Sequence, residues 1–249
     1  MSGKKESYKV KIWINGVEKE LETKIKINLE EIPSEASKYY SEENGMICIN
    51  EKFFDDSRKV PPDSRFIIDI DCKGVITNAK IGDSNPKLNK YIFLVLESPH
   101  RDEYTWKSEC LTPSKPAQGT TGMRIEENLE YVLMAINPKL GNSLEVGKYE
   151  VILINPVPFQ ASLGSLYTGE IQGELRNEIW TLLWKDTKCK DEFLGTIAKK
   201  QQDVKLIINS CTIQLQKHVQ QALTEPNKGY QIVKMRHPSQ WNLGIDFTP

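Results

Sequence analysis

The chain has 249 residues, of which 39% are hydrophobic and 27% are charged, and these proportions are typical of globular proteins. The formal net charge at pH 7 is −1, so no bulk positive charge attracts the chain to nucleic acid. No apolar run approaches the roughly 20 residues that cross a bilayer, and Lys4 and Lys5 precede no apolar signal segment. We therefore expect a soluble cytoplasmic protein that does not bind membranes.

The five cysteines lie far apart, and no two of them are close enough in sequence to share a metal site. Their odd number argues against a disulfide framework, and their spacing argues against zinc or iron–sulphur ligation. The acidic pairs Asp69 with Asp71 and Asp102 with Glu103 are interpreted as solvated charges. We expect reduced thiols, no metal site and no cofactor.

Residues 1–85 are predicted to form a β-rich N-terminal region. Asn15-Gly16 is a strong hairpin signal between two alternating segments. A short helix is expected within Glu30–Glu43, and Gly82–Lys90 is predicted to be a linker. The predicted strands of this region are Tyr8–Ile14, Val17–Ile27, Met46–Phe53, Arg65–Ile70 and Val75–Ile81.

Residues 86–249 are predicted to form an α/β domain. Its four expected strands are continuous apolar runs, which are typical of strands buried on both faces, and helical segments alternate with them. This order predicts a central, mainly parallel, four-stranded sheet with helices on both faces. The strands are Tyr91–Leu96, Val151–Ile154, Lys205–Ile208 and Tyr230–Lys234, and the helices are Arg124–Ile136, Arg176–Trp184, Glu192–Lys200 and Ile213–Leu223.

Polar residues follow each of these predicted strands. Ligands of such sheets bind beyond the carboxyl ends of the strands, so polar groups gathered there form a pocket. The segments that follow the four strands are Glu97–His100, Asn155–Gln160, Asn209–Thr212 and Met235–Ser239.

In these segments the chain resembles the uracil-DNA glycosylase superfamily. That superfamily has a strand that ends in an acidic or polar motif with proline, a later strand that ends in Asn, and a last strand that ends in H-P-S. The sequences LESPH at Leu96–His100, LIN at Leu153–Asn155 and RHPS at Arg236–Ser239 occur here in that order. The resemblance covers about residues 91–242 and implies a uracil-DNA glycosylase-like fold, with DNA as the partner.

The resemblance implies a role for each of three residues in breaking an N-glycosidic bond. An enzyme of this class extrudes the nucleotide from the duplex. Glu97 would stabilise the sugar cation or orient a water, and His237 would lie beside the oxygen that gains charge on the leaving base. Asn155 suits the Watson–Crick edge of a pyrimidine. The structural alternatives are a turn-capping Glu97, a His237 bonded to backbone carbonyls and an Asn155 that begins a turn.

Further residues are assigned to the base and to the DNA backbone. Trp241 falls where the family inserts a large apolar residue into the DNA, although a core tryptophan is the alternative. Lys234 would assist the phosphate contacts. The base-binding candidates are Asn155, Ser98, His100 and Phe159, and the DNA-binding candidates are Ser210, Arg236, Ser239 and Trp241.

The chain departs from both best-known branches of the superfamily. The iron–sulphur branch requires four cysteines at a spacing that is absent here. The uracil branch has an aspartate before the proline and a tyrosine after it, whereas this chain has Ser98 and His100. No stacking aromatic residue can be assigned, although the long loop Arg101–Gly122 contains Tyr104 and Trp106. We therefore expect a bulky modified pyrimidine, such as a hypermodified cytosine of phage DNA, as the substrate in a defence role, with uracil as the competitor.

Two other classes of function stay open. One is a non-catalytic nucleic-acid-binding protein on the same fold, and the other is an unrelated α/β hydrolase. The chain contains no G-x-x-x-x-G-K-[ST], G-x-G-x-x-G or G-x-S-x-G motif, which disfavours phosphate-loop, dinucleotide and esterase functions. The role of residues 1–85 and the protein partners are left open.

The wide-pocket hypothesis predicts the effect of restoring a tyrosine at position 100. His100→Tyr should suppress excision of a modified pyrimidine more than excision of uracil, because the phenol ring would block a substituent on the base. The measurement is abasic-site formation on oligonucleotides that carry either base. Equal losses on both substrates would contradict the hypothesis.

Overall fold

The computed structural model describes residues 8–23, 32, 34–44, 46–79, 90–166, 173–224, 229–243 and 247–248. Short 3-10 helices lie at Ser34–Ala36, Glu51–Phe54, Asp56–Arg58, Arg101–Glu103 and Pro238–Leu243. The helices are α1 (Thr120–Lys139), α2 (Gly173–Asp186), α3 (Cys189–Ala198) and α4 (Ile213–Leu223). The strands are β1 (Tyr8–Ile14), β2 (Val17–Thr23), β3 (Tyr40–Glu43), β4 (Met46–Ile49), β5 (Asp63–Ile70), β6 (Ile76–Ala79), β7 (Tyr91–Val95), β8 (Tyr104–Lys107), β9 (Cys110–Pro113), β10 (Gly147–Ile154), β11 (Val204–Asn209), β12 (Gln231–Met235) and β13 (Phe247–Thr248).

The chain forms two compact units that interleave along the sequence. The first unit comprises residues 1–60, 98–114 and 157–190, and the second comprises residues 61–97, 115–156 and 191–249. This arrangement differs from the expected division at residue 85, because β5 pairs with β10 and therefore belongs to the sheet of the second unit. The predicted linker lies outside the described residues except for Lys90.

The first unit contains, in its described part, a four-stranded sheet in the order β2-β1-β4-β3. β1 and β2 form the hairpin that the Asn15-Gly16 pair predicts, and both turn residues have positive φ angles, of 51° and 74°. Val10, Ile12 and Ile14 are buried at alternate positions of β1, so one face of this strand packs against the interior. The part of the predicted second strand beyond Thr23 lies outside the described residues.

Two predictions in the first unit are wrong in detail, and a third is confirmed in part. The short helix expected within Glu30–Glu43 is present as the 3-10 helix Ser34–Ala36, whereas residues 40–43 form β3, where Tyr40 pairs with Ile49 of β4. The expected strand Met46–Phe53 ends at Ile49, because the Asn50 side chain accepts a hydrogen bond from the Lys52 amide and begins a 3-10 helix. The expected loop after residue 101 contains the β8–β9 hairpin. Local hydrogen bonds and strand pairing override the apolar pattern in these segments.

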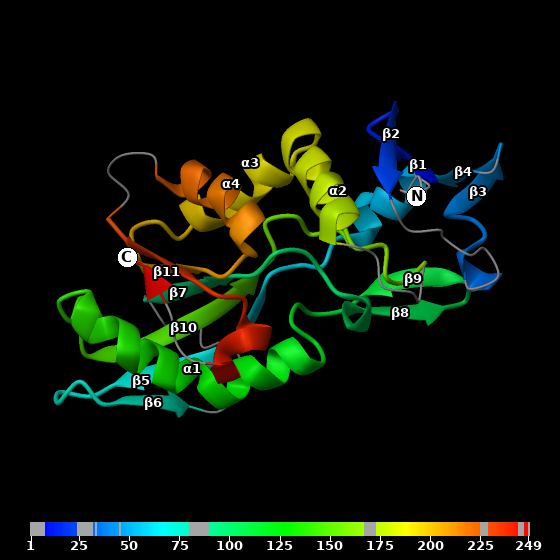
Figure 1. Ribbon diagram of the computed structural model, residues 1–249. Coiled ribbons are helices and arrows are strands. Elements are labelled where there is room, and N and C mark those ends of the chain that lie inside the picture. The colour runs from blue at the N-terminus through cyan, green and yellow to red at the C-terminus, as the bar shows by residue number, and fades with distance from the viewer. Residues whose placement is uncertain are drawn as a thin grey trace, which may run out of the picture. The chain divides into compact units, whose positions relative to one another are not determined.

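The second unit contains a mixed sheet in the order β13-β12-β11-β7-β10-β5-β6 (Figure 1). The neighbouring strands β12, β11, β7 and β10 pair in parallel. β13, β5 and β6 add antiparallel pairing at the two sides. The expected α/β class is confirmed, but the described sheet has seven strands rather than four. The antiparallel strands β5 and β6 come from the region that was expected to be separate.

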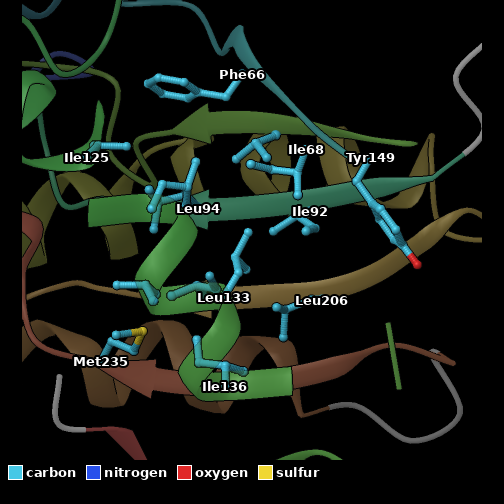
Figure 2. Close-up of a cluster of buried hydrophobic side chains, with 14 of the residues drawn as sticks. Phe66, Ile68, Ile92, Leu94, Ile125, Leu133, Ile136, Tyr149, Leu206 and Met235 are labelled. Carbon is cyan, nitrogen blue, oxygen red and sulfur yellow. The ribbon is translucent and has the colours of Figure 1, made fainter. Parts of the chain in front are cut away.

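Helix α1 covers one face of this sheet, and α4 lies on the other face (Figure 1). The buried residues of α1 recur at the spacing of one helix face, and they pack with sheet residues such as Leu94 and Met235 (Figure 2). Phe93 and Val95 are buried on the opposite face of β7, which explains the continuous apolar run. The buried apolar positions of α1 are Ile125, Leu129, Val132, Leu133 and Ile136.

The predicted helices are all present, and their ends shift by a few residues. The bounds of α4 are confirmed as Ile213–Leu223, with Leu215, Val219, Ala222 and Leu223 buried. α1 extends beyond both predicted ends, to Thr120 and Lys139. The sequence periodicity therefore predicts the positions of helices better than their termini.

The start of α1 predicts a difference between two glycine substitutions. A Cβ atom at Gly122 would lie 2.0 Å from the backbone oxygen of Ala117, whereas a Cβ atom at Gly195 of α3 would meet nothing within 4 Å. The Ala117 oxygen is also held by the Arg65 Nη1 group at 2.9 Å. Gly122→Ala should therefore lower the free energy of unfolding by about 1–3 kcal/mol. Gly195→Ala should raise it by up to about 1 kcal/mol.

Urea denaturation of the two variants and the unchanged protein measures both effects. Equal midpoints for Gly122→Ala and Gly195→Ala would contradict the close approach at the start of α1.

Candidate functional site

The register of the parallel strands brings four loop beginnings to one edge of the sheet. Val95 of β7 pairs with Ile154 of β10 and with Asn209 of β11, and Asn209 pairs with Lys234 of β12. The strands therefore end at the same level. Glu97, Asn155, Ser210 and His237 follow these strand ends within three residues, all in the second unit.

Glu97 is a buried carboxylate at the amino end of α4. Its side chain is 5% exposed, and Oε2 accepts a hydrogen bond from the Thr212 backbone N–H at 3.2 Å. Thr212 is the N-cap residue of α4, and no side-chain capping bond is made by Thr212 itself. A carboxylate at this place is stabilised by the helix dipole and by the unsatisfied N–H groups of the first turn. The Thr212 N–H thus fixes the Glu97 side chain at the candidate site.

Cys211 links the ends of β7 and β11 next to Glu97. Its thiol donates a hydrogen bond to the backbone oxygen of Leu96. Burial raises the pKa of the Cys211 thiol well above its usual value, and the negative charge of Glu97 raises this pKa further. Burial and the raised pKa favour the neutral thiol over the nucleophilic thiolate, and its hydrogen bond to Leu96 fixes the loop.

Asn155 follows β10 directly and is 6% exposed. The strand ladder continues up to it, because the Leu96 N–H donates to the Ile154 oxygen at 2.9 Å. An amide at this position has both a donor and an acceptor, which is what recognition of a base edge requires.

His237 is half-buried after β12, and its ring is held by the next turn. Nδ1 lies 2.9 Å from the Ser239 hydroxyl and accepts the Ser239 backbone N–H at 3.4 Å. Because an accepting Nδ1 carries no proton, the neutral imidazole has its proton on Nε2. Nε2 is then the ring nitrogen that donates, as the interpretation of H-P-S requires.

Arg236 and Ser239 are exposed beside His237, as the phosphate-binding interpretation requires. Two other DNA-binding predictions differ from the structure. Trp241 is 3% exposed, belongs to the core and donates its Nε1 proton to the Arg236 oxygen at 3.0 Å. Ser210 is 0% exposed. Both side chains are buried, so in this structure neither reaches a DNA strand.

The remaining candidates, Ser98, His100 and Phe159, lie in the first unit. Ser98 is half-buried. The His100 side chain is 61% exposed, and its Nδ1 lies 3.3 Å from an Asp102 oxygen. Phe159 is 3% exposed and packs edge to face with Phe54 at a centroid distance of 6.1 Å. These three residues are therefore placed in a different unit from Glu97, Asn155 and His237.

Gln216 was not predicted, whereas Asn209 belongs to the polar segment expected after the third strand, and these two residues connect the strand ends. The side-chain amide of Gln216 donates a hydrogen bond to the backbone oxygen of Asn209 at 2.8 Å and another to the backbone oxygen of Met235 at 2.9 Å. The side-chain amide of Asn209 in turn donates to the backbone oxygen of Gln216 at 3.1 Å. A signal existed in the sequence, because Gln216 lies beside the apolar stripe of α4. A polar residue in that position usually bonds to backbone groups.

The described residues contain no group of three or more His, Cys, Asp or Glu side chains that could hold a metal ion. In the same part of the chain, no helix has both the length and the apolar character needed to cross a membrane.

Comparisons with protein-family models, with curated proteins and with solved structures found no match to this chain.

The environment of Cys211 predicts a contrast in thiol reactivity. In the folded protein at neutral pH, Cys211 should react with a thiol reagent far more slowly than the exposed Cys72, because only the thiolate is nucleophilic. The measurement is time-resolved labelling followed by peptide mass mapping. Glu97→Gln should leave Cys211 slow, since burial is the larger cause of its raised pKa. Labelling of Cys211 at the rate of Cys72 would contradict the described packing.

Proposed function

We propose that this chain is a DNA glycosylase that flips a pyrimidine out of DNA and hydrolyses its N-glycosidic bond, leaving an abasic site. The observation that supports the proposal best is the shared register of β7, β10, β11 and β12. It brings a buried carboxylate, a buried amide and a half-buried imidazole to one edge of a sheet. These are the groups that the sequence resemblance to the uracil-DNA glycosylase superfamily requires, and the fold proposed here is of that kind.

In the proposed reaction, a water oxygen bonds to the sugar carbon while the bond from that carbon to the base nitrogen breaks. The bonding electron pair leaves with the base, and Glu97 accepts the proton of the water. Glu97 also stabilises the positive charge that develops on the sugar. The enclosed position of this carboxylate strengthens the interaction, because few waters screen it.

The leaving base gains negative charge on its carbonyl oxygen. The Nε2–H group of His237 donates to this oxygen, since Ser239 holds Nδ1 as the acceptor. A fixed donor of this kind is worth a few kcal/mol in a transition state. Asn155 would bind the Watson–Crick edge of the flipped base, while Arg236 and Ser239 would contact the phosphates.

The proposed substrate is a bulky modified pyrimidine, such as a hypermodified cytosine of phage DNA, with uracil as the competing substrate. Ser98 and His100 stand where the uracil branch has an aspartate and a tyrosine. In the uracil branch that tyrosine excludes a substituent on the base, so its absence from this sequence supports a substituted pyrimidine as the substrate. A defence role in a cytoplasmic setting would follow from this choice of substrate.

A non-catalytic nucleic-acid-binding protein is the second candidate, and one observation favours it. Glu97 already has a structural task, because its carboxylate accepts the Thr212 N–H at the start of α4. A fold that had lost its chemistry would keep such a carboxylate for capping.

The proposal predicts that the charge of Glu97 is required for activity even where the capping bond is kept. Glu97→Gln retains an oxygen acceptor for the Thr212 N–H, yet should lower abasic-site formation by about 10²–10⁴-fold. His237→Ala should lower it by about 10²–10³-fold. The substrates are oligonucleotides with uracil, plain cytosine or glucosylated hydroxymethylcytosine. The matched control is Glu127→Gln on α1, where the carboxylate is exposed and pairs with Arg124.

Full activity of Glu97→Gln would overturn the proposed chemistry. If the unchanged protein cleaves none of the substrates but binds the oligonucleotides, the non-catalytic alternative holds.

A further inference from the structure

The first unit contains a cavity of about 430 Å³ that the proposed function does not use. Its walls come from the end of β1, from the 3-10 helices at Glu51–Phe54 and Asp56–Arg58, from Phe159 and from the segment between α2 and α3. Small-molecule sites have volumes of about 300–1,000 Å³ and combine apolar walls with a few polar groups. The size and the lining of this cavity therefore suit a small ligand.

Apart from Trp13, the apolar residues that line the cavity are buried and closely packed. Phe54 and Phe159 are 9% and 3% exposed, and their rings meet at an interplanar angle of 86°. The Lys59 Nζ atom lies 5.6 Å from the centre of the Phe159 ring, and Leu183 is fully buried. This edge-to-face packing holds the two rings in place, so the apolar wall is formed before any ligand binds.

Trp13 gives the cavity a planar surface that is open to solvent. Its side chain is 37% exposed. An indole beside a cavity is a stacking surface for a flat aromatic ring, and bases stack on such groups irrespective of their sequence.

The rim of the cavity carries both cations and carboxylates. Lys59 pairs with Asp56 at 2.9 Å, and Asp55 accepts hydrogen bonds from the backbone N–H and the hydroxyl of Ser57. These carboxylates already have partners, and they offset part of the positive charge at the rim.

Lys52 and Lys188 also line the cavity. Both side chains are exposed, and neither forms an ion pair with another described residue. Glu51 is the carboxylate that stands nearest in sequence to Lys52 and likewise lines the cavity. Two lysines are thus available to an anionic group such as a phosphate, while the mixed rim offers both donors and acceptors to the edge of a base.

We propose that this cavity binds a nucleotide, with the base stacked on Trp13 and the phosphate beside Lys52 and Lys188. The nucleotide is either a free mononucleotide or one unit of a single strand, because both present the same ring and phosphate. The proposal is independent of the glycosylase chemistry, which is assigned to Glu97, Asn155 and His237 of the second unit.

The test uses the full chain and isothermal titration with adenosine monophosphate, adenosine and inorganic phosphate. Adenosine monophosphate should bind most tightly, because it alone makes both contacts. Trp13→Ala should weaken its binding about tenfold or more, whereas Trp13→Phe should retain part of the affinity through its remaining aromatic face. The double variant with Lys52→Gln and Lys188→Gln should weaken the monophosphate but leave the affinity for adenosine unchanged.

Two controls separate binding from folding. Lys190→Gln changes an exposed lysine that does not line the cavity, and it should leave every affinity unchanged. Urea midpoints of all variants should agree with that of the unchanged protein, and Trp13→Phe keeps the proposal testable if Trp13→Ala does not fold.

The source of the nucleotide is resolved by a parallel titration with a short single-stranded oligodeoxyadenylate. Tighter binding of the oligomer than of the monophosphate, lost in Trp13→Ala, would identify a nucleic-acid strand as the source. Tighter binding of the monophosphate would identify a free nucleotide. Binding of neither probe, or binding that neither the Trp13 nor the lysine variants reduce, would overturn the proposal.

Discussion

The parallel pairing of β7 with both β10 and β11 is the constraint on which the rest of the second unit depends. β7 lies between these strands and is apolar on both faces, so its backbone groups must be bonded to its neighbours. α1 covers one face of the strand with a continuous cluster of aliphatic side chains. Because buried strands have little freedom of register, their ends fall at one level, and the residues after them share one edge.

That shared edge holds most of the buried polar side chains of the second unit, namely Glu97, Asn155, Asn209 and Ser210. Leaving a buried polar group without a hydrogen bond costs about 1–3 kcal/mol, and most of these groups are bonded. Glu97 accepts from the first turn of α4, while Gln216 bonds to the ends of β11 and β12. The hydroxyls of Ser210 and Thr212 are exceptions, since both are buried and have no hydrogen-bond partner among the described residues. The same contacts that fix the loops also fix the candidate catalytic groups.

The first unit has a different physical basis. Three separate segments of the chain form this unit. Aromatic packing is prominent in the unit. Trp180 and Trp184 of α2 stack with centroids 5.2 Å apart, and Tyr39 packs against Phe53 at 6.0 Å. Phe54 and Phe159, which pack edge to face, also line the cavity of this unit, so part of the cavity wall belongs to the core of the unit.

The sequence by itself determined the α/β class, the positions of all four helices and the edge at which the polar residues gather. These features follow from local periodicity and from the direction of parallel strands, and each can be predicted from a short segment of the sequence alone. The tertiary structure decided the pairing of β5 with β10, the division into interleaved units and the burial of Trp241 and Ser210. Each of these depends on contacts between residues that are distant in the chain. A single-sequence pattern carries no record of such contacts, because the same apolar or aromatic residue suits a core and a binding surface equally well.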